Sequence, residues 1–112
     1  MFDCHLDEDV FEVVKNGTKR VEVRLYDEKR KTMKISDKLT FIKRPLLEEK
    51  IETKIIELKR FKKLEDLINN YEMKDIYIEG FSKDEFIELL GRFYSKEEQE
   101  KYGFVAIEFE VI

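Results

Sequence analysis

The sequence is poor in several residue types: among 112 residues it has no tryptophan, one histidine, one cysteine, one proline and four glycines. With a single cysteine, Cys4, no disulfide can form within the chain, which favours a reducing compartment, and we expect a cytoplasmic protein. One histidine and one cysteine cannot supply the usual ligands of a zinc site. Carboxylates alone could still bind a hard metal, but no Asp-rich loop has EF-hand spacing. We therefore expect neither a metal nor a cofactor.

Long apolar runs are also missing. No stretch approaches the roughly 20 apolar residues that cross a bilayer, so we expect no membrane partner. The apolar fraction of 42% includes nine Phe and five Tyr, which argues against disorder, and the charged fraction of 43% indicates a small core under a charged surface. Since the lone proline and the dispersed glycines mark no boundary, we expect one domain over residues 1–112.

Charge is unevenly distributed along the chain, although the net charge of −4 argues against a general DNA-binding protein. Residues 15–44 carry eleven Lys or Arg against four acids, whereas residues 1–14 carry five acids and no Lys or Arg. A basic block in an acidic chain is typical of proteins that bind a phosphate-bearing ligand. The alternative is that Lys29, Arg30, Lys31 and Lys34 only solvate a turn.

Alternating and helical patterns predict strands early, helices in the middle and a strand at the end. The expected strands are 19–26, 38–43, 51–58 with a slip at Ile55–Ile56, and 105–111. A slip of this kind indicates a bulge or burial on both faces. The expected helices are 7–16, a segment with Leu64, Leu67, Ile68 and Tyr71 at helical spacing, and two opened by the capping boxes at Ser82 and Ser95. In the Ser82 helix we expect Phe86, Leu89, Leu90 and Phe93 to face inward.

This order predicts an α+β fold, in which helices pack on a small curved sheet or barrel. The last strand is expected to pair with an early one. The sequence does not indicate the oligomeric state.

The first strand carries the most informative polar cluster. Glu22 and Arg24 are two residues apart, so their side chains project from the same face, and Lys19 lies at the mouth of the strand after Gly17. Together, a lysine, a carboxylate and a guanidinium can bind an anion, accept a proton, and donate two parallel hydrogen bonds to an acceptor edge of a ligand. The alternative is a salt bridge between Glu22 and Arg24 on the solvated face of the sheet.

The stretch Gly17-Thr18-Lys19-Arg20-Val21-Glu22-Val23-Arg24 resembles the G-x-K-x-x-E-x-R signature of the ASCH domain family. Further similarity lies in Ile35, Asp37, Leu39 and Phe41 and in the segment 94–109, so the resemblance covers nearly the whole chain. Ser36 departs from the family pattern, which usually has Gly before this Asp, and a turn with positive φ costs more with Ser.

The resemblance implies a small PUA-like β-barrel of about five to six strands with three or four short helices. It also implies a cleft where the signature strand meets the helical segment, and RNA, a nucleotide or a nucleoside as ligand. The residues expected to contact that ligand are Lys19, Arg20, Glu22, Arg24, Tyr26, Tyr94 and Tyr102. One of the three tyrosines is expected to stack on a base.

We expect Cys4 and His5 to lie at a mobile end with no functional role.

An enzymatic alternative also follows from the resemblance. Some small bacterial ASCH proteins are amidohydrolases that deacetylate 4-N-acetylcytidine with a lysine, a threonine and a glutamate. By position these correspond to Lys19, Glu22 and Glu79, and Glu22 lacks the hydroxyl nucleophile. A different hydrolysis, or a nuclease, would use Glu22 as general base and Lys19 to stabilise the oxyanion. A third possibility is a protein-interaction module whose cleft is filled by its own side chains.

Overall fold

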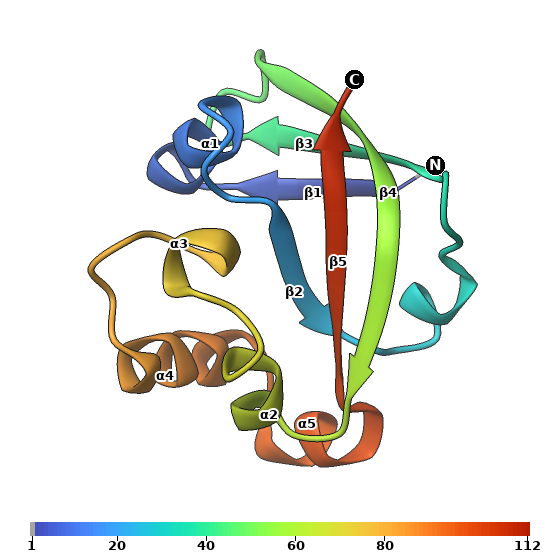
Figure 1. Ribbon diagram of the computed structural model, residues 1–112, viewed down its shortest axis with the longest axis vertical. Helices are drawn as coiled ribbons and strands as arrows, with labels where there is room; N and C mark the ends of the chain where they lie inside the picture. The colour runs from blue at the N-terminus through green and yellow to red at the C-terminus, as the bar shows by residue number, and fades with distance from the viewer. Residues whose placement is uncertain (1) are drawn as a thin grey trace.

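The computed structural model describes residues 2–112 and has an α+β fold built on a curled, five-stranded half-barrel sheet (Figure 1). Within these residues the strands are β1 (Phe2–Leu6), β2 (Val21–Leu25), β3 (Lys38–Lys43), β4 (Lys50–Phe61) and β5 (Phe104–Val111). The helices are α1 (Glu8–Lys15), α2 (Leu64–Ile68), α3 (Met73–Ile76), α4 (Lys83–Phe93) and α5 (Lys96–Tyr102), with a 3₁₀ helix at Arg30–Thr32. The five α-helices exceed the three or four expected, because α3 has no clear sequence pattern.

The strand order is β1-β3-β4-β5-β2, with β1 parallel to β3 and the other neighbours antiparallel. The pairing of β5 with β2 confirms that the last strand joins an early one. In Figure 1, β1 and β3 run across the view while β2, β4 and β5 run along it, which is the curl of the sheet. Within the described chain β1 and β2 are the two edges of the sheet, so its hydrogen bonding is open between them.

Local sequence signals account for most element boundaries. Helix α1 starts after Asp7 and ends before Gly17, which adopts φ +86°. Ser82 and Ser95 each accept a hydrogen bond from the backbone three residues on, and both capping boxes are complete, as expected. Gly103 ends α5 with φ +67°. These signals act within a few residues, which is why the sequence predicted them well.

The irregularity in β4 is a β-bulge. The register against β5 shifts between Ile55 and Glu57, and Ile55 is fully buried while Ile56 is exposed. The slip in alternation therefore marks a bulge and not burial on both faces. Strand β4 continues to Phe61, three residues beyond its expected end, because it pairs with β5 along this extension.

The N-terminal segment is a strand, and the expectation of a mobile end was wrong. Cys4 and His5 lie in β1, which pairs with β3 in the register Cys4 opposite Phe41, and the Cys4 side chain is buried in the core. Parallel pairing with a strand more than thirty residues away supplies the order that the short segment alone does not indicate.

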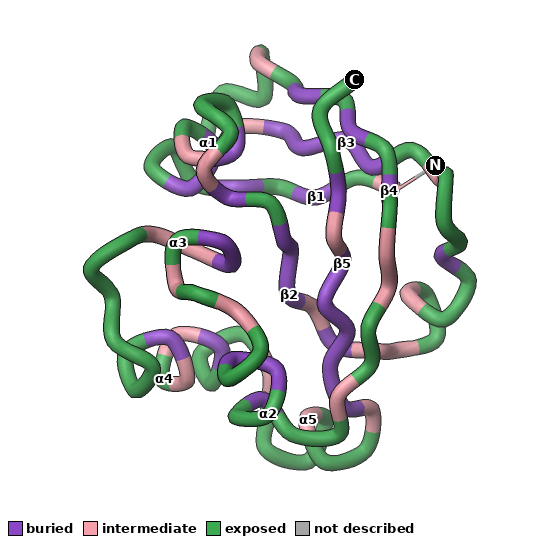
Figure 2. The backbone as a smooth tube through the Cα atoms, in the orientation of Figure 1, coloured by how far each residue is buried: buried purple, intermediate pink, exposed green. Residues whose placement is uncertain are grey.

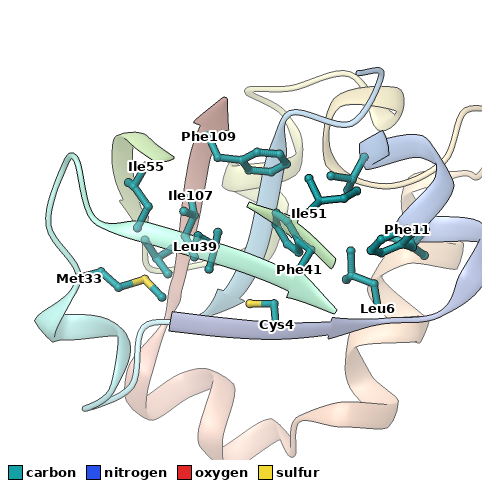
Figure 3. Packing of buried hydrophobic residues seen from close by; sticks show 13 residues of the cluster. Cys4, Leu6, Phe11, Met33, Leu39, Phe41, Ile51, Ile55, Ile107 and Phe109 are labelled. Carbon is teal, nitrogen blue, oxygen red and sulfur yellow. The ribbon is translucent and has the colours of Figure 1, made fainter. Parts of the chain in front are cut away.

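The core has two parts, one on each face of the sheet. Figure 2 shows that many of the buried positions lie along β2, β3 and β5. The concave part includes Leu39, Phe41 and Phe109, with the Phe41 and Phe109 ring centroids 4.9 Å apart (Figure 3). The other part packs Val21, Val23 and Phe104 against α2 and α4. Phe93 was expected in this core but is 61% exposed, since it lies in the last turn of α4 beyond the packed stripe.

Ser36, at the position where the family pattern has glycine, adopts the left-handed φ of +79°. Its N–H donates to the Ile55 carbonyl at 2.8 Å, which ties the turn to β4. None of the helices formed by residues 2–112 has the length and apolar character of a membrane span.

Candidate ligand-binding cleft

Lys19, Glu22 and Arg24 form one buried chain of charges. Lys19 Nζ lies 2.8 Å from Glu22 Oε1, and Arg24 Nε lies 2.7 Å from Glu22 Oε2. Lys19 and Glu22 are only 2% and 5% exposed. The Glu22–Arg24 salt bridge of the alternative interpretation is present, but it lies inside the molecule instead of on a solvated face.

The backbone explains why these charges point inward. Gly17 turns the chain after α1, and the Lys19 N–H then donates to the Val13 carbonyl at 2.9 Å. Strand β2 places Glu22 opposite Ile107 and Arg24 opposite Val105, on the concave face of the sheet. Lys19 Nζ also donates to the Val21 carbonyl. In this apolar surrounding each charge requires a partner, and the chain supplies one.

The electrostatics keep Glu22 and Arg24 ionised. Burial would raise the pKa of Glu22, but the charges of Lys19 and Arg24 and their hydrogen bonds lower it to about 2. Burial would likewise lower the pKa of Arg24, but the Glu22 carboxylate raises it above its ordinary value. Glu22 is therefore a fixed acceptor between two cations.

Arg24 keeps free hydrogen-bond donors. Its Nε is bonded to Glu22, and its two terminal nitrogens have no hydrogen-bond partner among residues 2–112. The Arg24 side chain is 22% exposed, and it lines a cleft with a volume of about 520 Å³. A guanidinium held at one nitrogen and open at the other two presents a rigid fork to an acceptor.

The cleft has a polar wall and an apolar wall. Besides Lys19, Glu22 and Arg24, polar and charged residues from β1 and the loops line it: Asp3, His5, Asp7, Lys29, Arg30 and Arg44. Residues of α3, α4 and their ends form the apolar wall: Ile76, Tyr77, Phe86, Leu89, Leu90, Phe93 and Tyr94. The cleft lies between the open edges of the sheet, where β1 and β2 do not pair.

Of the three candidate tyrosines, only Tyr94 lines this cleft. Tyr26 instead lies under the Arg60 guanidinium, 4.6 Å from ring centroid to Cζ, and Tyr102 has the Lys101 ammonium 5.1 Å from its ring centroid. Both tyrosines lie at the start of β5, because the Tyr26 N–H donates to the carbonyl of Gly103, which directly precedes that strand.

Two other predicted residues lie outside the cleft. The Arg20 side chain points outward and pairs with Asp75 at 3.2 Å. Glu79 lines a separate hollow between α3 and α4, together with Phe81 and Lys83. The structure therefore brings Lys19, Glu22, Arg24 and Tyr94 together and places Arg20 and Glu79 elsewhere.

Sequence reasoning missed the contribution of β1. Cys4 and His5 line the cleft, and burial, followed by the Glu22 carboxylate, raises the pKa of the Cys4 thiol. The thiol is therefore neutral and a poor nucleophile. The alternation of Phe2, Cys4 and Leu6 is the signal that would have indicated a strand. Within residues 2–112 no three His, Cys, Asp or Glu side chains are grouped to hold a metal ion.

Comparison with protein families agrees with the signature on β2, because the model of the ASCH domain matches residues 5–112. The chain belongs to the ASCH domain family. Two solved structures resemble this ASCH protein: hypothetical protein PH0355, with a TM-score of 0.84 and 29% identity over 99% of this chain and 98% of that one; and protein PF0455 from Pyrococcus furiosus, with a TM-score of 0.78 and 28% identity over 100% and 98%. No curated protein matches the chain.

Proposed function

We propose that the cleft binds the base of a nucleotide or of single-stranded RNA. The observation that carries this proposal is the buried chain of Lys19, Glu22 and Arg24, which leaves the terminal nitrogens of Arg24 free at the cleft. A guanidinium fork bonds the acceptor edge of a base or a phosphate oxygen with defined geometry. Membership of the ASCH family supports an RNA-related ligand.

The apolar wall supplies a stacking surface. Tyr94 and its neighbour Phe93 line the cleft. Phe93 is 61% exposed, which is unusual for a large aromatic residue unless its ring contacts a binding partner. Unpaired bases are commonly held by stacking on such side chains. A base between this wall and Arg24 would meet stacking and hydrogen bonding together.

Cations at the cleft attract the phosphate of the ligand. Five cationic side chains line it against three acidic ones, a balance of +2 in a chain of net charge −4. Lys29, Arg30 and Arg44 belong to the basic block that the sequence places between residues 15 and 44. We expect binding to weaken as ionic strength rises.

Hydrolysis is less well supported by the chemistry of the cleft. A general base works best with a pKa near the operating pH, whereas the pKa of Glu22 is about 2. Glu79, the third member of the hydrolytic set, lies in the separate hollow between α3 and α4. These observations favour binding over amidohydrolase or nuclease activity.

The test is incubation of the protein with a panel of nucleosides, nucleotides and short RNA oligonucleotides, followed by mass spectrometry of retained ligand and of converted product. We expect retention without conversion. Arg24→Ala should weaken binding by about tenfold or more, and Arg24→Lys should not restore it, because lysine lacks the fork. Arg92→Ala, at an exposed arginine paired with Glu88, is the control.

Two results would contradict the proposal. Failure to retain any member of the panel at low salt would exclude a nucleotide ligand, and equal binding by the Arg24→Ala variant would exclude this cleft. Conversion of an acylated nucleoside would establish hydrolysis instead.

A further inference from the structure

Strand β2 is an open edge of the sheet, and its main chain points alternately toward β5 and away from it. The Arg20 carbonyl accepts from the Phe109 N–H at 3.1 Å, and the Tyr26 N–H donates to the Gly103 carbonyl at 3.0 Å. Even-numbered residues therefore bond to β5. The N–H and C=O groups of Val21, Val23 and Leu25 point to the edge that no strand covers.

Among these three residues, Val23 alone presents free main-chain groups to the cleft. Lys19 Nζ occupies the Val21 carbonyl, and Leu25 does not line the cleft. The Val23 N–H and C=O have no hydrogen-bond partner within residues 2–112, although Val23 is only 7% exposed. Nearly buried main-chain groups without a protein partner are costly unless water or a ligand bonds them.

Strand β1 forms the facing edge of the same cleft. The Leu6 carbonyl accepts from the Arg44 N–H at 2.8 Å, so the even-numbered residues of β1 bond to β3. The main-chain groups of Asp3 and His5 consequently point away from β3, and both residues line the cleft. Two strand edges therefore border a cleft that Arg24 and the aromatic wall also line.

We infer that the Val23 main chain reads the hydrogen-bonding edge of the bound base, with its N–H donating to an acceptor and its C=O accepting from the neighbouring donor. This inference rests on the proposed function and makes Val23 a specificity-determining residue. The Watson–Crick edge of every nucleobase carries such a donor and acceptor side by side. Arg24, which only donates, then bonds a further acceptor of the ligand.

A base fits these groups better than an extended peptide does. A peptide that adds to a sheet edge pairs with several outward residues in succession. On β2 the Val21 carbonyl is already taken and Leu25 lies beyond the cleft, so one residue of this edge is available. On the facing β1 edge the His5 carbonyl already accepts from the Arg44 guanidinium at 3.3 Å, so that edge does not offer a peptide a continuous row of free groups either. A single donor–acceptor pair opposite an aromatic wall matches one planar ring.

Hydrogen exchange of individual amides tests the inference in isotope-labelled protein. The Val23 amide is followed with and without each of the four ribonucleoside 5′-monophosphates, and binding is measured in parallel by calorimetry. Leu25 is the matched control, because its amide lies on the same open edge outside the cleft. We expect a bound nucleotide to slow Val23 exchange by about tenfold or more and to leave Leu25 unchanged.

Analogues of the tightest-binding monophosphate provide the second measurement. For adenine or cytosine the analogue lacks the ring acceptor, as in 1-deazaadenosine or 3-deazacytidine monophosphate. For guanine or uracil the ring N–H is methylated, as in 1-methylguanosine or 3-methyluridine monophosphate. We expect the analogue to bind about tenfold more weakly or worse, because one Val23 hydrogen bond is lost.

The outcomes separate the inference from the proposed function. If a nucleotide binds but Val23 exchange stays the same, slows together with that of Leu25, or the analogue binds equally well, the reading by Val23 is refuted and cleft binding stands. If no monophosphate binds and no RNA is retained, both fail.

Discussion

The buried chain of charges makes Glu22→Gln the most informative single substitution. Glu22 bonds Lys19 at 2.8 Å and Arg24 at 2.7 Å, and it is 5% exposed. Glutamine has nearly the same shape but no charge, so the variant leaves two cations in the interior with no carboxylate. The change therefore removes electrostatic stabilisation while it disturbs packing little.

Two estimates of the free energy of unfolding lost in Glu22→Gln agree. Removing one partner of a buried ion pair typically costs about 3–5 kcal/mol. Independently, the pKa of Glu22 falls from the ordinary 4.5 to about 2, and at about 1.4 kcal/mol per unit this corresponds to roughly 3 kcal/mol. We expect the free energy of unfolding of the variant to be lower by about 3 kcal/mol at neutral pH.

The lowered pKa of Glu22 also predicts how the stability of the fold depends on pH. Because the pKa of Glu22 is lower in the folded state than in the unfolded state, its contribution is complete above pH 4.5 and is lost as the pH falls toward 2. Wild-type protein should lose roughly 2 kcal/mol of this contribution between about pH 7 and pH 3, and Glu22→Gln has no such contribution to lose. The difference in free energy of unfolding between wild type and Glu22→Gln should therefore be smaller at pH 3 than at pH 7.

Urea unfolding monitored by circular dichroism at both pH values provides the measurement. Glu52→Gln, at an exposed carboxylate 3.9 Å from Lys38, is the control and should change the free energy of unfolding by less than about 0.5 kcal/mol. A Glu22→Gln variant as stable as wild type, or a stability gap that is the same at both pH values, would refute the reasoning.

Further predictions concern backbone conformation and stacking. Ser36→Gly should stabilise the fold by about 0.5–1 kcal/mol in urea unfolding, because φ +79° is strained for serine, and a loss of stability would contradict this. Gly103→Ala should destabilise the fold by about 2 kcal/mol or more, because the new Cβ would lie 2.8 Å from the Phe61 carbonyl oxygen and because φ is +67° there. The control is Gly91→Ala on α4, where the new Cβ meets open space, and it should stabilise the fold by up to about 1 kcal/mol. Phe93→Ala should weaken nucleotide binding by about tenfold in calorimetry and leave the thermal midpoint nearly unchanged; equal affinity would exclude stacking on Phe93.

The geometry of the candidate site could be predicted where a strand pattern and a family signature coincided. The spacing of Glu22 and Arg24 correctly placed both on one face, and the structure shows that they meet Lys19. The pattern could not tell whether that face was solvated, because alternation looks the same on either side of a sheet. Burial of the cluster depends on the curl of the sheet and on β1.

The residues whose positions the sequence could not predict depend on long-range contacts. Tyr26 and Tyr102 each come soon after a cleft residue in the sequence. The hydrogen bond from the Tyr26 N–H to the Gly103 carbonyl, however, places both tyrosines at the start of β5, away from the cleft. Phe93 continues the apolar spacing of α4, yet the packed stripe ends before it. Neither fact is visible in a window of neighbouring residues.

The sequence by itself determined the elements whose causes are local: the capping boxes at Ser82 and Ser95, strand 38–43 with its correct bounds, and an irregularity at Ile55–Ile56 that the structure shows to be a bulge. Only the tertiary structure decided that β1 pairs with β3, that an open gap separates β1 from β2, and that Val23 faces this gap unpaired. The physical reason is range. Caps and alternation are set by atoms a few residues apart, whereas a cleft between two strand edges exists only after the whole sheet has curled.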